Sequence, residues 1–142
     1  MAIKNVMVLD DHELFRTSAS ILLTENFSPI TINQFSDPES AIEYFLQCKK
    51  EQQSIDLIIT DQIHPGADGF AFASACRFIE KQYDKVSPIL LLSMTVNDTA
   101  QHELVFNNNI SADNPFNLRL PKSVESEKLI YCISQLMNIA IS

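Results

Sequence analysis

The chain has 142 residues, of which 46% are hydrophobic and 20% are charged. This length and composition predict a single globular domain over residues 1–142 and exclude a disordered or repetitive protein. Eighteen acidic residues against ten basic ones give a formal net charge of −8, which opposes direct binding to nucleic acid or to anionic membrane surfaces. No apolar run is long enough to cross a bilayer and no signal peptide begins the chain, so we expect a cytoplasmic protein.

Strand-like and helix-like segments alternate along the chain. Short apolar runs bounded by turn-forming residues predict strands at about residues 3–9, 29–35, 55–60, 89–93 and 118–120. The segments between them are predicted as helices, which begin near His12, at Asp37-Pro38, after Asp68-Gly69 and after Ser123. The alternation predicts an α/β fold in which helices cover both faces of a parallel sheet. The first, third and fourth strands are continuously apolar, as central strands buried on both faces require.

Polar residues follow the ends of several predicted strands. Asp10 and Asp11 come directly after the first apolar run, Asp61 ends the third, Ser93 ends the fourth, and Lys122 follows the fifth. In a doubly wound sheet of strand order 2-1-3-4-5, the first and third strands are neighbours at the topological switch point, where ligand crevices open at the carboxyl ends of the strands. We therefore expect the three acids to lie together, with the serine and the lysine in the same crevice.

This set of residues predicts phosphoryl chemistry assisted by a metal ion. Two unit charges about 4 Å apart repel by roughly 4 kcal/mol at an effective dielectric constant of about 20, so clustered carboxylates require a neutralising cation. Oxygen ligands without a thiolate or histidine partner favour Mg²⁺. The three cysteines, Cys48, Cys76 and Cys132, form no CxxC pair and are predicted to be buried free thiols. With the cation bound, a carboxylate can attack a phosphoryl group, while a hydroxyl and a fixed positive charge contact the transferred oxygens.

Taken in chain order, these motifs resemble the receiver domains of bacterial two-component response regulators. The resemblance covers nearly the whole chain and rests on the runs Val8 to Arg16, Asp56 to Asp61, Pro65 with Asp68-Gly69, Leu92-Ser93, and Leu120-Pro121-Lys122-Ser123. It implies a (βα)5 three-layer sandwich of the flavodoxin-like or CheY-like type. The first and last of these runs look most like receivers that precede a helix-turn-helix DNA-binding domain, although we see no such effector domain within residues 1–142.

By this resemblance, Asp61 looks like the phosphoacceptor, and Ser93 and Lys122 match the hydroxyl and the lysine that contact the phosphoryl group. The resemblance also implies Mg²⁺ as cofactor, bound by three carboxylates and one backbone carbonyl, those of Asp10, Asp11, Asp61 and Ile63. The phosphoryl donor would be a phosphohistidine on a sensor histidine kinase or phosphotransfer protein. Phosphorylation would shift the face formed by the fourth helix, fifth strand and fifth helix toward a downstream partner, a linked output domain or a homodimer. Such a protein is not an enzyme, apart from its own phosphorylation and slow dephosphorylation.

Three features depart from the pattern of this family. Arg119 stands three residues before the lysine, where the family usually has an aromatic residue that moves between outward and inward rotamers. Residues 107–117 are dense in turn formers and predict a long surface loop, with Phe116 on the output face. This loop is either a remodelled output surface or a tolerated insertion. His64 stands where methionine is common, and we expect it to pack in its loop, with a metal or acid-base role as the alternative.

Three other functions are compatible with the sequence. The chain would be the receiver part of a DNA-binding transcription regulator if the reading frame continues into such a domain. A receiver-like module that acts without phosphorylation would keep the fold but lack Mg²⁺ binding and phosphoryl transfer. A Mg²⁺-dependent phosphatase would be expected to carry an Asp-x-Asp run after the first strand, whereas this chain has adjacent Asp10 and Asp11 and places the better nucleophile on the third strand.

Overall fold

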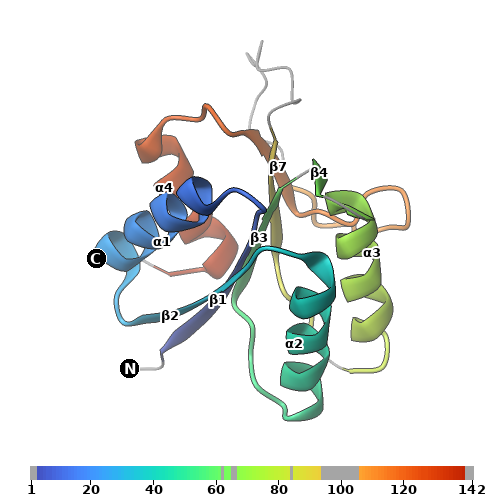
Figure 1. The fold of residues 1–142 in the computed structure, drawn as a ribbon. Coiled ribbons are helices and arrows are strands. Elements are labelled where there is room, and N and C mark those ends of the chain that lie inside the picture. The colour runs from blue at the N-terminus through green and yellow to red at the C-terminus, as the bar shows by residue number, and fades with distance from the viewer. Residues whose placement is uncertain (1–2, 62, 65–66, 84, 94–105, 140–142) are drawn as a thin grey trace.

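Five parallel strands form one sheet in the computed structural model (Figure 1), which describes residues 3–139 except 62, 65–66, 84 and 94–105. The strands are β1 (Lys4–Leu9), β2 (Ile30–Phe35), β3 (Leu57–Asp61), β6 (Ile89–Ser93) and β7 (Leu118–Pro121). Their order is β2-β1-β3-β6-β7, and every pairing is parallel. This is the predicted order 2-1-3-4-5, with the three continuously apolar strands at the centre.

Helices cover both faces of the sheet (Figure 1). The helices α1 (Glu13–Phe27) and α4 (Ser126–Met137) lie on one face, and α2 (Pro38–Lys50) and α3 (Gly69–Glu80) lie on the other. A hairpin of β4 (Ile63–His64) and β5 (Ala67–Asp68) connects β3 to α3. The expected helix between β6 and β7 falls on residues 94–105, outside the described part of the chain. The three-layer α/β architecture is confirmed.

Each face of the sheet has its own hydrophobic cluster. Met7 and Leu9 of β1 point into the cluster beneath α2 and α3, whereas Val6 and Val8 point into the cluster beneath α1 and α4. Successive side chains on a strand point to opposite faces, so a central strand must be apolar at every position to serve both clusters. This requirement explains the continuous apolar runs, and it fixes the strand ends at which the polar residues begin.

Local capping explains where two of the helices begin. The Asp37 side chain accepts a hydrogen bond from the Ser40 amide at 2.9 Å, and Pro38 occupies the first turn, so α2 starts where predicted. Helix α4 begins at Ser126 instead of directly after Ser123, because the Val124 amide first donates to the Pro121 carbonyl at 3.0 Å in a turn. The predicted helix is present, and its start lies later in the chain.

The segment 107–117 is fixed to the core at its carboxyl end. Phe116 is 1% exposed and belongs to the hydrophobic cluster beneath α2 and α3. The Phe116 carbonyl accepts a hydrogen bond from Asn107 Nδ2 at 2.9 Å, and the Pro115 carbonyl accepts one from Arg77 Nε at 2.9 Å. The prediction of a surface Phe116 is therefore wrong, although residues 111–113 are exposed as a surface loop requires.

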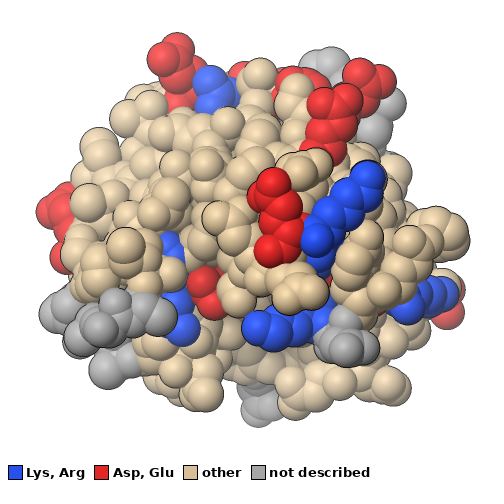
Figure 2. All heavy atoms as spheres, turned by 90° about the horizontal axis from the view of Figure 1, so that it is seen from below, with Lys and Arg blue, Asp and Glu red and all other residues tan. Residues whose placement is uncertain are grey.

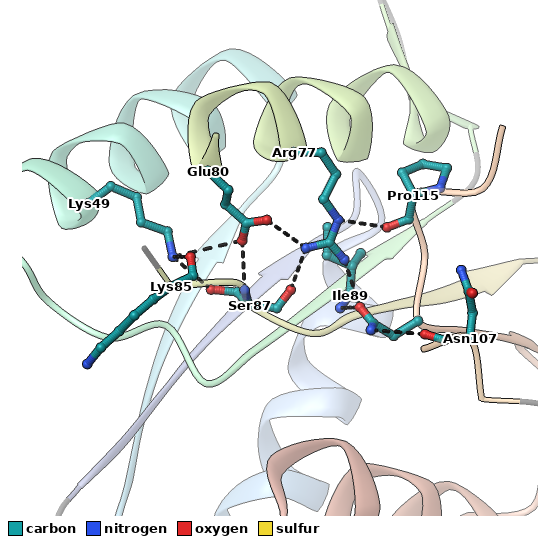
Figure 3. Close-up of polar contacts among 9 residues, drawn as sticks. Lys49, Arg77, Glu80, Lys85, Ser87, Ile89, Asn107 and Pro115 are labelled. Carbon is teal, nitrogen blue, oxygen red and sulfur yellow. Dashed lines mark hydrogen bonds and ion pairs between the residues drawn. The ribbon is translucent and has the colours of Figure 1, made fainter. Parts of the chain in front are cut away.

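A buried ionic cluster, which we call the Glu80 cluster, lies at the amino ends of the strands. It consists of Asn117 and four residues labelled in Figure 3, which are Lys49, Arg77, Glu80 and Ser87. Glu80 Oε1 lies 2.8 Å from Arg77 Nη1, and Glu80 Oε2 lies 3.8 Å from Lys49 Nζ. The Ser87 amide donates to Glu80 Oε2 at 2.7 Å, and Arg77 Nη2 donates to Asn117 Oδ1 at 2.7 Å. These contacts join α2 and α3 to the beginnings of β6 and β7.

The cysteines, the charged surface and the apolar character of the helices complete the description of the fold. All three cysteines are free and buried, as predicted. Basic and acidic side chains are interspersed on the end of the molecule seen in Figure 2, where the strands begin. Within the described ranges, no helix combines the length and apolar character needed to cross a membrane.

Candidate functional site

The carboxyl ends of β1, β3 and β7 bring two acids and a lysine together. Asp10 follows β1, Asp61 is the last residue of β3, and Lys122 follows β7. Lys122 Nζ lies 2.8 Å from Asp10 Oδ2 and 3.3 Å from Asp61 Oδ1, and the exposed fractions of these side chains are 3%, 8% and 7%. Parallel strands that end at one edge of the sheet thus place three of the predicted site residues in direct contact.

The Asp10 carboxylate is held from several sides. Burial alone would raise its pKa, but contact with the Lys122 ammonium and a 2.9 Å hydrogen bond from the His12 backbone amide outweigh burial and lower the pKa. Arg16 Nη1 donates to the Asp10 backbone carbonyl at 2.7 Å, which fixes the main chain at the same residue. Asp10 is therefore an ionised and oriented carboxylate at neutral pH.

Asp11 and His12 extend the group of acids toward solvent. His12 Nδ1 lies 3.2 Å from Asp10 Oδ1 and 3.1 Å from Asp11 Oδ1. One potential ligand atom from each of Asp10, Asp11, His12 and Asp61 lies within 4.8 Å of the others. His12 is the N-cap residue of α1, as predicted, and its side chain makes no capping hydrogen bond. Its contact with both acids was not predicted.

Phe15 of α1 is a second neighbour that the sequence analysis missed. Lys122 Nζ lies 3.9 Å from the centroid of the Phe15 ring, and the His12 ring packs edge-on to the same ring at 6.0 Å. The contact with Lys122 joins residues far apart in the chain, so no local pattern predicts it. A local signal existed only for the contact between His12 and Phe15, which are three residues apart at the start of α1.

Three further predicted residues are placed by their backbones. Ser93 ends β6 and pairs with Pro121 in the sheet register, so its main chain lies at the same edge as the acids. Ile63 pairs with Asp68 within the β4–β5 hairpin, and His64 follows it in the same strand. The side chains of Ser93, Ile63 and His64 lie outside the described part of the structure.

This arrangement fits both a hard cation and an anion. Three carboxylates carry more negative charge than Lys122 neutralises, and carboxylate oxygens are the ligands that Mg²⁺ prefers. The Lys122 ammonium already pairs with Asp10 and Asp61 at 2.8 and 3.3 Å. An ammonium carries three N–H donors, so it can contact the acids and an acceptor such as a phosphoryl oxygen together.

Most of the chain matches a known protein family. The model of the response regulator receiver domain matches residues 6–112, which include most of β1, all of β3 and β6, and both acid-bearing strand ends. The chain belongs to the response regulator receiver domain family. Receiver domains are parts of response regulators or histidine kinases in two-component signalling, and acceptance of a phosphoryl group on aspartate with Mg²⁺ is a general feature of the family. Lys122 lies beyond the matched residues, so its place beside the acids comes from the structure.

Solved receiver domains share the fold of this one. A response regulator receiver domain protein from Clostridium thermocellum has a TM-score of 0.70 at 18% identity, covering 96% of this chain and 95% of that one. Chemotaxis protein CheY4 of Vibrio cholerae has a TM-score of 0.69 at 24% identity, with coverages of 95% and 99%. The receiver domain of the Arabidopsis thaliana histidine kinase CKI1, complexed with Mg²⁺ and BeF₃⁻, has a TM-score of 0.70 at 21% identity, with coverages of 95% and 90%. At these identities the likeness establishes the fold.

A curated relative matches part of this receiver domain. The Fimbriae Z protein of Salmonella typhimurium is 30% identical over 77 residues, which are 54% of this chain and 34% of that protein. The matched region thus spans about a third of the relative. The match agrees with the receiver family and carries no information about the remainder of the Fimbriae Z protein.

Proposed function

We propose that Asp61 is the phosphoacceptor of this receiver domain in a Mg²⁺-dependent phosphorelay. The observation that carries the proposal is the position of the buried Lys122 ammonium, 3.3 Å from an Asp61 oxygen and 2.8 Å from an Asp10 oxygen. A phosphoryl group on Asp61 would bring its own oxygens within reach of the same cation, and contacts between an ammonium and phosphoryl oxygens are strong. The general function of the family supports this assignment.

The donor that fits is a phosphohistidine on a sensor histidine kinase or a phosphotransfer protein. The phosphorus–nitrogen bond of the donor breaks as a phosphorus–oxygen bond forms to the Asp61 carboxylate, and the leaving imidazole takes up a proton to become neutral. Lys122 offsets the charge of the transferred group, and Ser93, whose main chain ends β6 at the same edge, would supply a hydroxyl to a second phosphoryl oxygen. The product is an aspartyl phosphate, whose slow hydrolysis returns the receiver to its starting state.

Mg²⁺ would be held by three carboxylates and one backbone carbonyl, those of Asp10, Asp11, Asp61 and Ile63. When bound, the ion offsets the repulsion between the incoming phosphoryl group and the acids. The chain prepares Asp10 for this role, because the His12 amide bonds to its carboxylate and Arg16 bonds to its carbonyl. Support for the cation comes from the oxygen-rich donor set and from the CKI1 receiver domain, which is known in complex with Mg²⁺ and BeF₃⁻.

Output would pass through β7, α4 and the segment between β6 and β7. Arg119 on β7 is exposed, and its guanidinium carbon lies 5.2 Å from the centroid of the buried Phe116 ring. This stacking gives the cation a fixed support where the family usually has a mobile aromatic residue. We infer that residues 1–142 form one cytoplasmic receiver domain that changes state without turning over a substrate. It would act on a downstream protein or a linked output domain, with a phosphorylation-dependent homodimer as an alternative.

Labelling with acetyl phosphate and Mg²⁺ tests the phosphoacceptor. Wild type is expected to gain one phosphoryl group by mass spectrometry, and Asp61→Asn is expected to gain none. Asp56→Asn is the matched control, because Asp56 precedes the same strand at its opposite end and accepts a hydrogen bond from the Asn5 amide, which asparagine can preserve. Labelling that survives in Asp61→Asn would refute the assignment. If wild type neither binds Mg²⁺ nor becomes labelled, the protein would instead be a module that acts without phosphorylation.

A second candidate is the receiver part of a longer DNA-binding regulator. It is favoured by the match to the Fimbriae Z protein, of which the matched region covers 34%. The reading frame that contains residues 1–142 tests this candidate, since a following helix-turn-helix domain would support it. Phosphorylation at Asp61 is expected in both cases, so the labelling experiment and the reading frame answer separate questions.

A further inference from the structure

Among the described residues, three charged or aromatic groups contact the Lys122 ammonium, and one of them is an aromatic ring. Two are the carboxylates of Asp10 and Asp61, and the third is the face of Phe15, whose centroid lies 3.9 Å from Nζ. A cation within about 6 Å of a ring centroid is attracted by the negative face of the ring, more strongly when water is excluded. The Lys122 side chain is 3% exposed, so the contact belongs to the strong class.

The acids and the ring together determine where this ammonium lies. Asp10 and Asp61 draw the nitrogen to 2.8 and 3.3 Å from their carboxylate oxygens, and the ring face of Phe15 contacts it at 3.9 Å. Charge attraction between Lys122 and two acids leaves the direction of the ammonium loosely defined, because it depends mainly on distance. The ring adds a preferred direction, since the attraction is strongest over the face.

Crowding does not explain the contact. Phe15 and Lys122 both line a cavity of about 250 Å³, together with apolar residues of α1, β6 and the segment before α4. Side chains beside a cavity have space for other rotamers, and Phe15 is itself 36% exposed. A ring that served only to fill space would be replaceable here by another apolar side chain of similar size.

We propose that Phe15 is a positioning residue, whose ring face holds the Lys122 ammonium between Asp10 and Asp61 before the phosphoryl group arrives. The inference rests on the proposed function, because its effect is measured as the rate at which Asp61 is phosphorylated. Holding the cation in place in advance avoids a rearrangement during transfer. The helix α1 then has a role at the site in addition to packing on the sheet, because its Phe15 contacts the Lys122 ammonium.

Fluorinated phenylalanines at position 15 test the ring face separately from its size. One, two or three fluorine atoms withdraw electron density from the ring with little change in volume, so cation attraction weakens stepwise. The initial rate of labelling by acetyl phosphate with Mg²⁺ is expected to fall at each step, by about 3- to 10-fold in total, within the 2- to 30-fold range that follows from the usual strength of such contacts. The Mg²⁺ dissociation constant is expected to stay within about twofold of the wild-type value. The urea midpoint is expected to equal that of wild type within error.

Position 78 supplies the matched control. Phe78 lies on α3 and is 66% exposed, so the same fluorinated residues there are expected to leave the labelling rate unchanged. Phe15→Tyr keeps a ring and should retain the rate within about twofold, whereas Phe15→Leu should lose as much as the trifluorinated ring. Proton NMR adds an independent readout, because the ring current shifts the Lys122 ε-methylene protons upfield in wild type and not in Phe15→Leu.

The outcomes separate this inference from the proposed function. Normal labelling of wild type with equal rates across the fluorinated series, or an unshifted Lys122 ε-methylene signal, overturns the role of Phe15 and leaves Asp61 as phosphoacceptor. Failure of wild type to be labelled overturns the proposed function and removes the basis for this inference with it. A stepwise loss at position 15, with none at position 78, supports the positioning role.

Discussion

Replacing Glu80 by glutamine should strongly destabilise the fold, because Glu80 is the acid that balances two buried cations in the Glu80 cluster. Its side chain is 4% exposed and lies 2.8 Å from Arg77 and 3.8 Å from Lys49. Glutamine preserves the shape but removes the carboxylate that pairs with Arg77 and Lys49. Its amide nitrogen would also face a donor in either orientation, because the Ser87 amide now donates to Oε2 at 2.7 Å and Arg77 Nη1 donates to Oε1 at 2.8 Å. Breaking a buried ion pair by removing one partner costs about 3–5 kcal/mol, a large part of the roughly 5–15 kcal/mol that stabilises a domain.

Urea unfolding followed by far-ultraviolet circular dichroism measures this loss of stability. The chain has no tryptophan whose fluorescence could report unfolding. With a denaturant slope of about 1–3 kcal/mol per molar, the midpoint of Glu80→Gln should fall by about 2 M. Glu43→Gln, on the exposed side of α2, is the control and should change stability by about 0.5 kcal/mol or less.

A double-mutant cycle identifies the cause of the loss. Adding Lys49→Met to Glu80→Gln removes one of the two unbalanced cations and should restore more than about 1 kcal/mol relative to Glu80→Gln alone. A Glu80→Gln variant within about 1 kcal/mol of wild type, or a double variant less stable than the single one, would refute the charge argument.

Three more predictions concern other buried groups. Contact with Lys122 and His12 lowers the pKa of Asp10 in the folded state despite burial. The stability that the ionised Asp10 contributes is therefore fully present above its unfolded pKa and is lost as the pH falls through its folded pKa. The difference in unfolding free energy between wild type and Asp10→Asn, measured without metal, should therefore shrink between about pH 6 and pH 2, and a constant difference would contradict this. Phe116→Ala should cost about 3–5 kcal/mol in urea unfolding and Phe78→Ala less than about 1 kcal/mol; equal losses would mean that Phe116 is not a core residue. Burial strongly raises the pKa of the Cys76 thiol, so iodoacetamide at pH 8 should modify Cys76 only after unfolding, as mass spectrometry of native and urea-treated protein would show.

Patterns within the sequence were sufficient to predict the sheet and the meeting of Asp10, Asp61 and Lys122 at one of its edges. The continuous apolar runs identified the central strands, since only strands buried on both faces lack alternation. The acids at the ends of β1 and β3 then met because those strands are neighbours at the switch point. Lys122 was predicted by the same reasoning, because it follows the last strand at the same edge.

The prediction failed for Phe116 because its environment depends on contacts between distant residues. Asparagine and proline around it indicate a loop, and a single phenylalanine has no periodicity that would assign it to the core. Phe116 packs in the cluster beneath α2 and α3, and the Pro115 carbonyl beside it accepts a hydrogen bond from Arg77, 38 positions earlier in the chain. The contact of Phe15 with Lys122 was missed for the same reason, since a helix near the start of the chain meets the end of the last strand.

The two outer strands of the sheet differ in how readily they could pair with another chain. β7 has four residues, carries the exposed Arg119 and ends at Pro121, which has no amide hydrogen to donate. Charge, proline and short length at a sheet edge all disfavour the addition of a foreign strand. β2 has six residues, Ile30–Phe35, without a charge or a proline. Edge-to-edge aggregation of this fold, if it occurs, would therefore begin at β2, on the opposite side of the sheet from β7.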